Sequence, residues 1–132
     1  MILKNNNQDE KFYAKMGKFF ADRSIIKELD CQLYNDNNMI WYLSINEEIE
    51  GFISVQDRGE YNYIDNFYII PKYRNKGIGK ILLNKVMLDN TKKIRLITRN
   101  EIALKMYQNL GFKIYSQNGR YFKLEYNKQC FK

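Results

Sequence analysis

A basic turn that carries two glycines, between a strand and a helix, constrains this chain more than any other stretch. Residues 69–80 have the sequence Ile-Ile-Pro-Lys-Tyr-Arg-Asn-Lys-Gly-Ile-Gly-Lys. The aromatic and β-branched residues 61–68 before it predict a strand, and Pro71 ends that strand because proline cannot donate to a ladder. After the turn, apolar residues at helical spacing predict a helix from about Gly77 to Asp89.

A helix start of this kind suits a phosphate group. The first N–H groups of a helix have no partner within it, and the helix dipole makes that end positive. Gly77 and Gly79 have no Cβ, so an anion can approach the backbone closely, and Arg74, Lys76 and Lys80 add positive charge. The competing interpretation is an ordinary strand-to-helix connection with solvated charges.

The spacing excludes two common nucleotide-binding motifs and matches a third. The P-loop spacing is absent, and leucine stands where the dinucleotide fingerprint needs its third glycine. Arg74, Gly77 and Gly79 form the pattern Arg-x-x-Gly-x-Gly, which resembles the pyrophosphate-binding motif of the GCN5-related N-acetyltransferase (GNAT) superfamily. Residues 100–112, Asn-Glu-Ile-Ala-Leu-Lys-Met-Tyr-Gln-Asn-Leu-Gly-Phe, resemble a second segment of that superfamily, Asn…Ala…Tyr…Leu-Gly-Phe. Residues 1–40 carry no such signature.

The order of predicted elements agrees with the fold that the resemblance implies, an α/β (α+β) fold. We expect a GNAT-like mixed central sheet of about six to seven strands with flanking helices and splayed fourth and fifth strands. The fifth strand should run parallel to the fourth, because a helix joins them. The length predicts one domain, residues 1–132, similar to acyl-CoA N-acyltransferases. Strands are expected at residues 1–4, 39–45, 49–56, 61–70, 94–98, 112–116 and 121–126.

Helical periodicity predicts which side chains face the core. A pattern near Ile25 either continues the first helix or starts a second one that Ser24 could cap, and Asn100 can cap the last helix. The residues on the apolar sides are Phe12, Tyr13, Met16, Phe19 and Phe20 in the first helix, Ile78, Ile81, Leu82, Val86 and Met87 in the helix after the turn, and Ile102, Ala103, Met106, Tyr107 and Leu110 in the last.

The charge balance favours an anionic partner. The chain has 22 Lys and Arg against 15 Asp and Glu, a formal net charge of +7. A phosphorylated coenzyme and a nucleic acid both fit this excess, and the net charge does not choose between them.

The remaining composition predicts where the protein works. No segment approaches the ~20 apolar residues of a membrane span, and no signal peptide is evident, so we expect no membrane association. Cys31 and Cys130 make a poor disulfide framework, which favours free thiols in a reducing, cytoplasmic setting. The sequence has no histidine and no cluster of metal ligands, so no metal is expected.

The resemblance also implies where a coenzyme A thioester, taken here as acetyl-CoA, binds as co-substrate. Backbone groups of Phe67, Tyr68 and Ile69 would bond the pantetheine arm as an added strand would. Asn100 matches a position that contacts the coenzyme arm, with a plain helix N-cap as the alternative. The pyrophosphate would bind near Arg74 on the amides of Asn75, Lys76, Gly77, Ile78, Gly79 and Lys80.

Two residues are candidates for catalysis. Tyr107 matches the superfamily's tyrosine near the thioester sulfur, where a phenol of pKa ≈ 10 can protonate a departing thiolate; the alternative is a core aromatic. Asp65, on the fourth strand, is one candidate for the general base, beside a tyrosine or a water that relays to a carboxylate. Some relatives carry a glutamate on the fifth strand, but residues 95–97 here are Arg-Leu-Ile.

The sequence therefore predicts an acetyl-CoA-dependent N-acetyltransferase in which an amine attacks the thioester directly. Neither cysteine lies in a motif, which argues against an acyl-enzyme. The acceptor, small or macromolecular, is expected to bind among the first helices, the turn at 57–60 and the closing hairpin. Two alternatives remain: a non-catalytic coenzyme-binding domain, and a protein of this fold that binds or modifies nucleic acid. The protein is expected to be a monomer or a homodimer.

Overall fold

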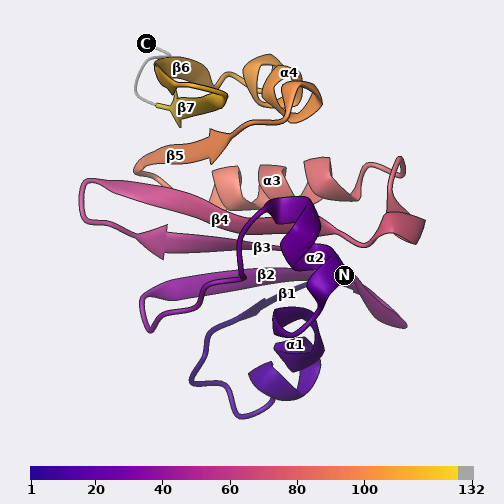
Figure 1. The fold of residues 1–132 in the computed structure, drawn as a ribbon. Coiled ribbons are helices and arrows are strands. Elements are labelled where there is room, and N and C mark those ends of the chain that lie inside the picture. The colour runs from indigo at the N-terminus through magenta and orange to yellow at the C-terminus, as the bar shows by residue number, and fades with distance from the viewer. Residues whose placement is uncertain (128–132) are drawn as a thin grey trace.

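A computed structural model describes residues 1–127 and shows one mixed sheet with helices on both of its faces (Figure 1). The strand order is β1-β2-β3-β4-β5-β7-β6, with β4 and β5 parallel and every other neighbouring pair antiparallel. The fold class, the order of elements along the chain and the parallel pairing of β4 with β5 are as predicted. The elements are β1 (Ile2–Asn5), α1 (Phe12–Phe20), α2 (Arg23–Leu29), β2 (Met39–Asn46), β3 (Glu48–Asp57), β4 (Tyr61–Ile69), a 3-10 turn (Pro71–Tyr73), α3 (Ile78–Asp89), β5 (Lys93–Thr98), α4 (Glu101–Asn109), β6 (Lys113–Asn118) and β7 (Tyr121–Tyr126).

One face of the sheet is covered by α3 and α4. Leu82 and Leu83 of α3 are fully buried, and truncating either to alanine should cost about 2–5 kcal/mol of stability. The cluster on this face consists of Tyr42, Ile53, Val55, Ile64, Ile78, Leu82, Leu83, Val86, Ile94, Leu96, Tyr107, Phe112 and Leu124.

The opposite face carries α1 and α2 over the first four strands (Figure 1). Its cluster is strongly aromatic, and the rings of Phe12, Trp41 and Phe52 meet at centroid distances of 5.5 and 5.9 Å. Such contacts add to the free energy of burial. The buried members are Phe12, Met16, Phe19, Ile25, Leu33, Met39, Trp41, Leu43, Phe52 and Tyr68.

A β-bulge in the middle of β4 changes which residues face which side. Ser54 pairs with Asp65, but Phe52 pairs with Tyr68, so β4 carries one extra residue there. Asn66 adopts a left-handed φ of 47°, which asparagine tolerates better than most residues. As a result, Asp65 and Tyr68 lie on the same side of the sheet although they are three residues apart.

The prediction that a residue lies in the core is wrong at three positions. Tyr13 is 53% exposed, Ile81 is 56% exposed and Ile102 is 84% exposed. Each of these residues lies at the margin of the apolar side of its helix. Helical spacing shows where the apolar side is, but it does not show how many of its residues the sheet covers. The capping prediction for the second helix also needs correction, because Asp22, not Ser24, accepts the N–H groups at its start.

None of the helices within residues 1–127 combines the length and the apolar character needed to cross a membrane. Cys31 is a free thiol, whereas Cys130 lies outside the described residues.

Candidate active site

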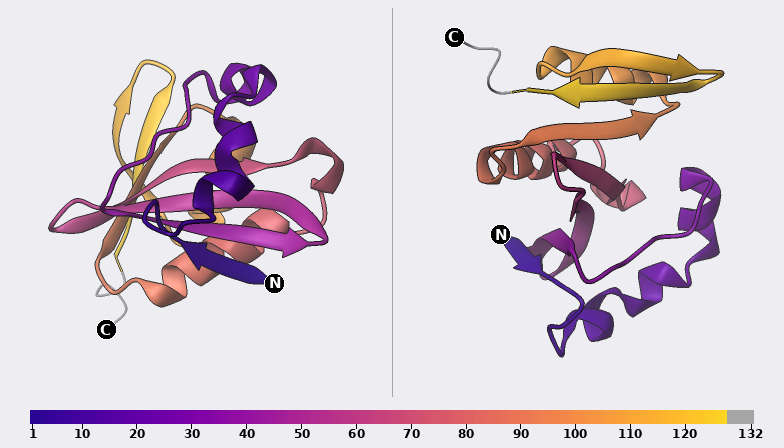
Figure 2. Two further views of the ribbon diagram at one scale, coloured as in Figure 1. Left: turned by 90° about the horizontal axis from the view of Figure 1, so that it is seen from below. Right: turned by 90° about the vertical axis from the view of Figure 1, so that its left-hand side faces the viewer.

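The parallel strands β4 and β5 separate soon after they begin. They pair only at Tyr61–Lys93, Asn62–Ile94 and Tyr63–Arg95, although β4 continues to Ile69 and β5 to Thr98. Figure 2 shows β5, β6 and β7 turning away from the first four strands. The predicted splay is therefore present.

A cavity of about 570 Å³ lies where the two strands separate. It brings together side chains from both strands, from α2 and α4, and from the closing hairpin. The turn at 57–60, which we expected to contribute, does not line it. The lining residues are Glu28, Leu29, Cys31, Tyr63, Ile64, Asp65, Asn66, Phe67, Leu96, Ile97, Thr98, Arg99, Asn100, Ala103, Tyr107 and Tyr121.

The predicted glycine turn follows β4 directly. Asn75 and Gly77 have left-handed φ values of 63° and 80°, and Gly77 is the N-cap of α3. A Cβ built on Gly79 would lie 3.5 Å from Phe67 and 3.6 Å from Ile69, so the first turn of α3 packs closely on the end of β4. The start of α3 thus lies next to the part of β4 that β5 leaves unpaired.

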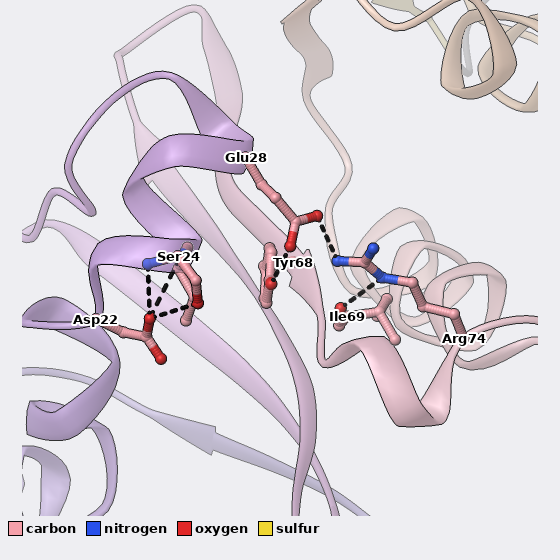
Figure 3. Close-up of polar contacts among 7 residues, drawn as sticks. Asp22, Ser24, Glu28, Tyr68, Ile69 and Arg74 are labelled. Carbon is pink, nitrogen blue, oxygen red and sulfur yellow. Dashed lines mark hydrogen bonds and ion pairs between the residues drawn. The ribbon is translucent and has the colours of Figure 1, made fainter.

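Arg74 lies at this turn, but its guanidinium already has partners (Figure 3). Its Nε donates to the carbonyl of Ile69 at 2.9 Å and its Nη2 to Glu28 at 2.8 Å. Hydrogen bonds from the Tyr68 hydroxyl and from Arg74 hold the pKa of Glu28 below its usual range. The Arg74 side chain remains 40% exposed, so it also stays accessible to an anion.

Tyr107 occupies the cavity wall from α4. It is 7% exposed, and its ring packs on Phe112 at a centroid distance of 5.7 Å. Burial raises the pKa of Tyr107 above that of a free phenol, so the hydroxyl stays protonated at neutral pH. The side chain is therefore a core aromatic whose hydroxyl is protonated; packing does not exclude the predicted role as proton donor, which stays a prediction.

Asp65 lines the same cavity from β4. Burial raises the pKa of its carboxyl, while the Asn66 N–H, at 2.8 Å, and the charge of Arg58 partly oppose the rise. A carboxylate with a raised pKa is a stronger base than an exposed one. Burial, followed by the charge of Asp65, raises the pKa of neighbouring Tyr63 to about 12, so this phenol stays protonated and is the poorer base of the two.

Comparison with known proteins gives a match over the part of the chain that holds Asp65, the glycine turn and Tyr107. Residues 36–114, more than half of the chain, match the model of the acetyltransferase (GNAT) domain. The chain belongs to the GNAT family.

Solved structures share the whole fold at low sequence identity. Escherichia coli ElaA superposes with a TM-score of 0.79 at 12% identity, covering 96% of this chain and 99% of that one. Arabidopsis thaliana NAA60 in complex with acetyl-CoA gives 0.70 at 15% identity, covering 98% and 99%. The PaiA N-acetyltransferase from Thermoplasma acidophilum in complex with coenzyme A gives 0.63 at 16% identity, covering 96% and 99%. The GNAT fold therefore extends to the first helices, which the family model does not cover.

The geometry fits the coenzyme that the GNAT fold implies. Among residues 1–127, one edge of β4 has no partner strand beyond Tyr63, and there an extended ligand can pair with the backbone. The α3 N-terminus and the left-handed residues Asn75 and Gly77 offer N–H groups to an anion. Lys76 and Lys80 are exposed beside them. No group of three or more potential metal ligands occurs among the described residues.

Asn100 has a structural role as the N-cap of α4. Its Oδ1 accepts from the N–H groups of Ile102 and Ala103 at 2.9 and 3.1 Å. It also lines the cavity, so its amide nitrogen is available for a coenzyme contact. Capping and the predicted coenzyme contact can therefore coexist.

Several cavity residues were missed by sequence reasoning because they belong to no motif. Glu28, Cys31 and Arg99 come from segments that are distant in the chain, and nothing in their local sequence marks them. Asn66 did leave a signal. An asparagine, a poor strand former, interrupts an aromatic strand and therefore could have indicated the bulge.

Proposed function

We propose that this protein is an N-acetyltransferase that transfers the acetyl group of acetyl-CoA to an amine by direct attack. The observation that carries the proposal is the cavity between the splayed β4 and β5, which Asp65 and Tyr107 both line. It lies beside a glycine turn suited to a pyrophosphate. Membership of the GNAT family supports the same activity.

Bound acetyl-CoA would supply an activated acetyl group as its thioester. The unpaired edge of β4 at Phe67, Tyr68 and Ile69 would hold the extended arm, and the turn from Asn75 to Lys80 would hold the pyrophosphate. The pantetheine arm and the pyrophosphate would thus be bound by one contiguous stretch of chain, which fixes where the acyl group lies relative to the cavity.

Two side chains would handle the protons. Asp65 would accept a proton from the ammonium form of the acceptor, because its raised pKa makes it a stronger base. Tyr107, which is protonated at neutral pH, would donate its hydroxyl proton to the departing sulfur as negative charge develops there in the same buried site. Since both carboxyl and phenol line one cavity, the amine can lose a proton and the thiolate gain one within the same site.

Cys31 also lines the cavity, which the sequence did not anticipate. Burial, Asp65 and Asp30 raise the pKa of its thiol, against the opposing charge of Arg99. A thiol with a raised pKa is a poor nucleophile, because the thiolate is the reactive form. Direct attack by the amine is therefore favoured over a cysteine-bound acyl intermediate.

The deciding experiment incubates the protein with acetyl-CoA and a panel of primary amines, including aminoacyl compounds and peptides, and follows free thiol release and product mass. We expect amine-dependent acetylation and no acetyl adduct on the protein in the absence of an acceptor. Coenzyme A binding without transfer to any amine would instead support a non-catalytic coenzyme-binding domain. An acetyl adduct on Cys31 would contradict direct attack.

A further inference from the structure

The last turn of α2 and the residues that follow it form polar contacts near both of the strands that part at the cavity. On the β4 side, Glu28 Oε1 accepts from the Tyr68 hydroxyl at 2.7 Å, and Glu28 Oε2 accepts from Arg74 at 2.8 Å (Figure 3). On the β5 side, Asp30 pairs with Arg99 at 3.2 Å, just beyond the end of that strand. The end of α2 therefore bridges the splay.

A third attachment comes from the β4 bulge. The side chain of Asn66 accepts from the N–H of Tyr34 at 2.8 Å and donates to the carbonyl of Tyr34 at 2.7 Å. It also donates to the Ser54 hydroxyl at 2.7 Å, so the amide is anchored to β3 as well. The segment from Glu28 to Tyr34, here called the bridge segment, is held at three points.

Apolar packing fixes the far end of the bridge segment, where Leu33 is buried in the aromatic cluster. Near Glu28 the packing is sparser, because Ile25 is the one buried residue among the seven of α2 and Leu29 is only partly buried. The position of the Glu28 end of the segment therefore depends more on its charged partners. Glu28, Leu29 and Cys31 line the cavity, so that position also sets one wall of the site.

Arg74 connects this wall to the coenzyme side. It is the arginine of the Arg-x-x-Gly-x-Gly turn, and its Nη2 is bonded to Glu28. An anion at the turn would be attracted by Arg74 and repelled by the Glu28 carboxylate. With an anion bound at the turn, one guanidinium would have two competing anionic partners, Glu28 on the wall and the anion at the turn.

We infer that Glu28 is a positioning residue that couples the two substrate sites, and that the coenzyme pyrophosphate competes with it for Arg74. Coenzyme binding then loosens the bridge segment and opens the cavity wall to the acceptor. The coupling is reciprocal: whatever weakens the bond between Glu28 and Arg74 strengthens coenzyme binding. This inference rests on the proposed function, because it requires coenzyme A at the glycine turn.

The test compares Glu28→Gln with the wild type by calorimetry with coenzyme A and by backbone hydrogen exchange over the bridge segment. The substitution removes the negative charge and leaves one acceptor oxygen for two donors. We expect the Kd for coenzyme A to fall by roughly two- to fivefold, the range of one partly exposed ion pair, and the gain to shrink at high salt. The bridge segment should exchange faster than in the wild type.

A matched control separates this local effect from the change in net charge. Glu10→Gln removes the same charge from an exposed position outside the site and should alter neither measurement. In the wild type, adding coenzyme A should speed exchange across the bridge segment. In Glu28→Gln the same addition should change exchange much less, since the bond to the carboxylate is already lost.

The outcomes are distinguishable. A merely structural Glu28 would give weaker or unchanged coenzyme binding together with faster exchange, and this would overturn the inference while leaving the proposed function intact. Slower exchange of the bridge segment on adding coenzyme A to the wild type would overturn it as well. If the folded wild type binds no coenzyme A, the proposed function fails and this inference fails with it.

Discussion

The two sides of the cavity are built in different ways. On the side proposed for the coenzyme, one contiguous stretch from Phe67 to Lys80 supplies the strand edge, the turn and the helix start, largely through its backbone. On the side proposed for the acceptor, the wall comes from α2, β5 and β7 and is held by side-chain contacts such as Asp30 with Arg99. A contiguous backbone site leaves a motif in the sequence, whereas a wall assembled from distant side chains does not.

This contrast predicts that the rate of acetyl transfer depends on single side chains, such as that of Tyr107, which line the cavity between the two sides. Tyr107→Phe keeps the ring on Phe112 and removes only the hydroxyl. The single-turnover rate of acetyl transfer should fall by roughly 10²–10⁴-fold, the usual range for general acid–base catalysis. Coenzyme A affinity and thermal stability should change little, and an undiminished rate would reduce Tyr107 to a core aromatic.

Asp65→Asn should have the next largest effect, a fall in rate of roughly 10²-fold. In the wild type, the rate should rise with pH as Asp65 loses its proton, with an apparent pKa above the usual ~3.9 for aspartate, and the variant should lack this rise.

Stability gives an independent check on Asp65. Because its pKa is raised in the folded state, the protonated carboxyl favours folding below the unfolded pKa, and this advantage is lost as pH rises through the folded pKa. The variant should therefore be at least as stable as the wild type at neutral pH, by thermal unfolding. A clear loss of stability would mean that the ionised carboxylate stabilises the fold and that its pKa is not raised.

On the coenzyme side, backbone geometry should matter more than side chains. Gly77→Val places a β-branched residue at φ 80°, which costs about 1–2 kcal/mol, and adds bulk near the expected pyrophosphate. Coenzyme A affinity should drop roughly tenfold, a difference of about 1.4 kcal/mol. Gly77→Asn is the matched control, since asparagine tolerates this conformation; full affinity in a folded Gly77→Val protein would contradict the site.

The smallest expected effect separates the two roles of Asn100. Asn100→Ala removes an N-cap and should lower the free energy of unfolding by about 1 kcal/mol, measured by denaturant titration. If the amide nitrogen also contacts the coenzyme arm, Asn100→Ser, which keeps a capping oxygen but loses the amide N–H donors, should bind coenzyme A more weakly than the wild type. Equal affinities would leave Asn100 as a cap alone.

The sequence by itself was enough for the order of elements along the chain, the parallel pairing of β4 with β5, the turn that begins α3 and the family. These features depend on periodicity, on glycine and proline conformations, and on motifs within short stretches. They can therefore be predicted from the sequence without a structure. The same local patterns misjudged Tyr13, Ile81 and Ile102, because the width of a buried stripe depends on what covers the helix.

Only the tertiary structure decided what surrounds the motifs. The bulge at Asn66 brings Asp65 and Tyr68 to one side of β4, Glu28 meets Arg74 across 46 residues of chain, and Cys31 enters the cavity wall. Such contacts depend on how α2 lies across the two parted strands. Helix placement is the sum of many weak, distant contacts, and no short stretch of sequence encodes it.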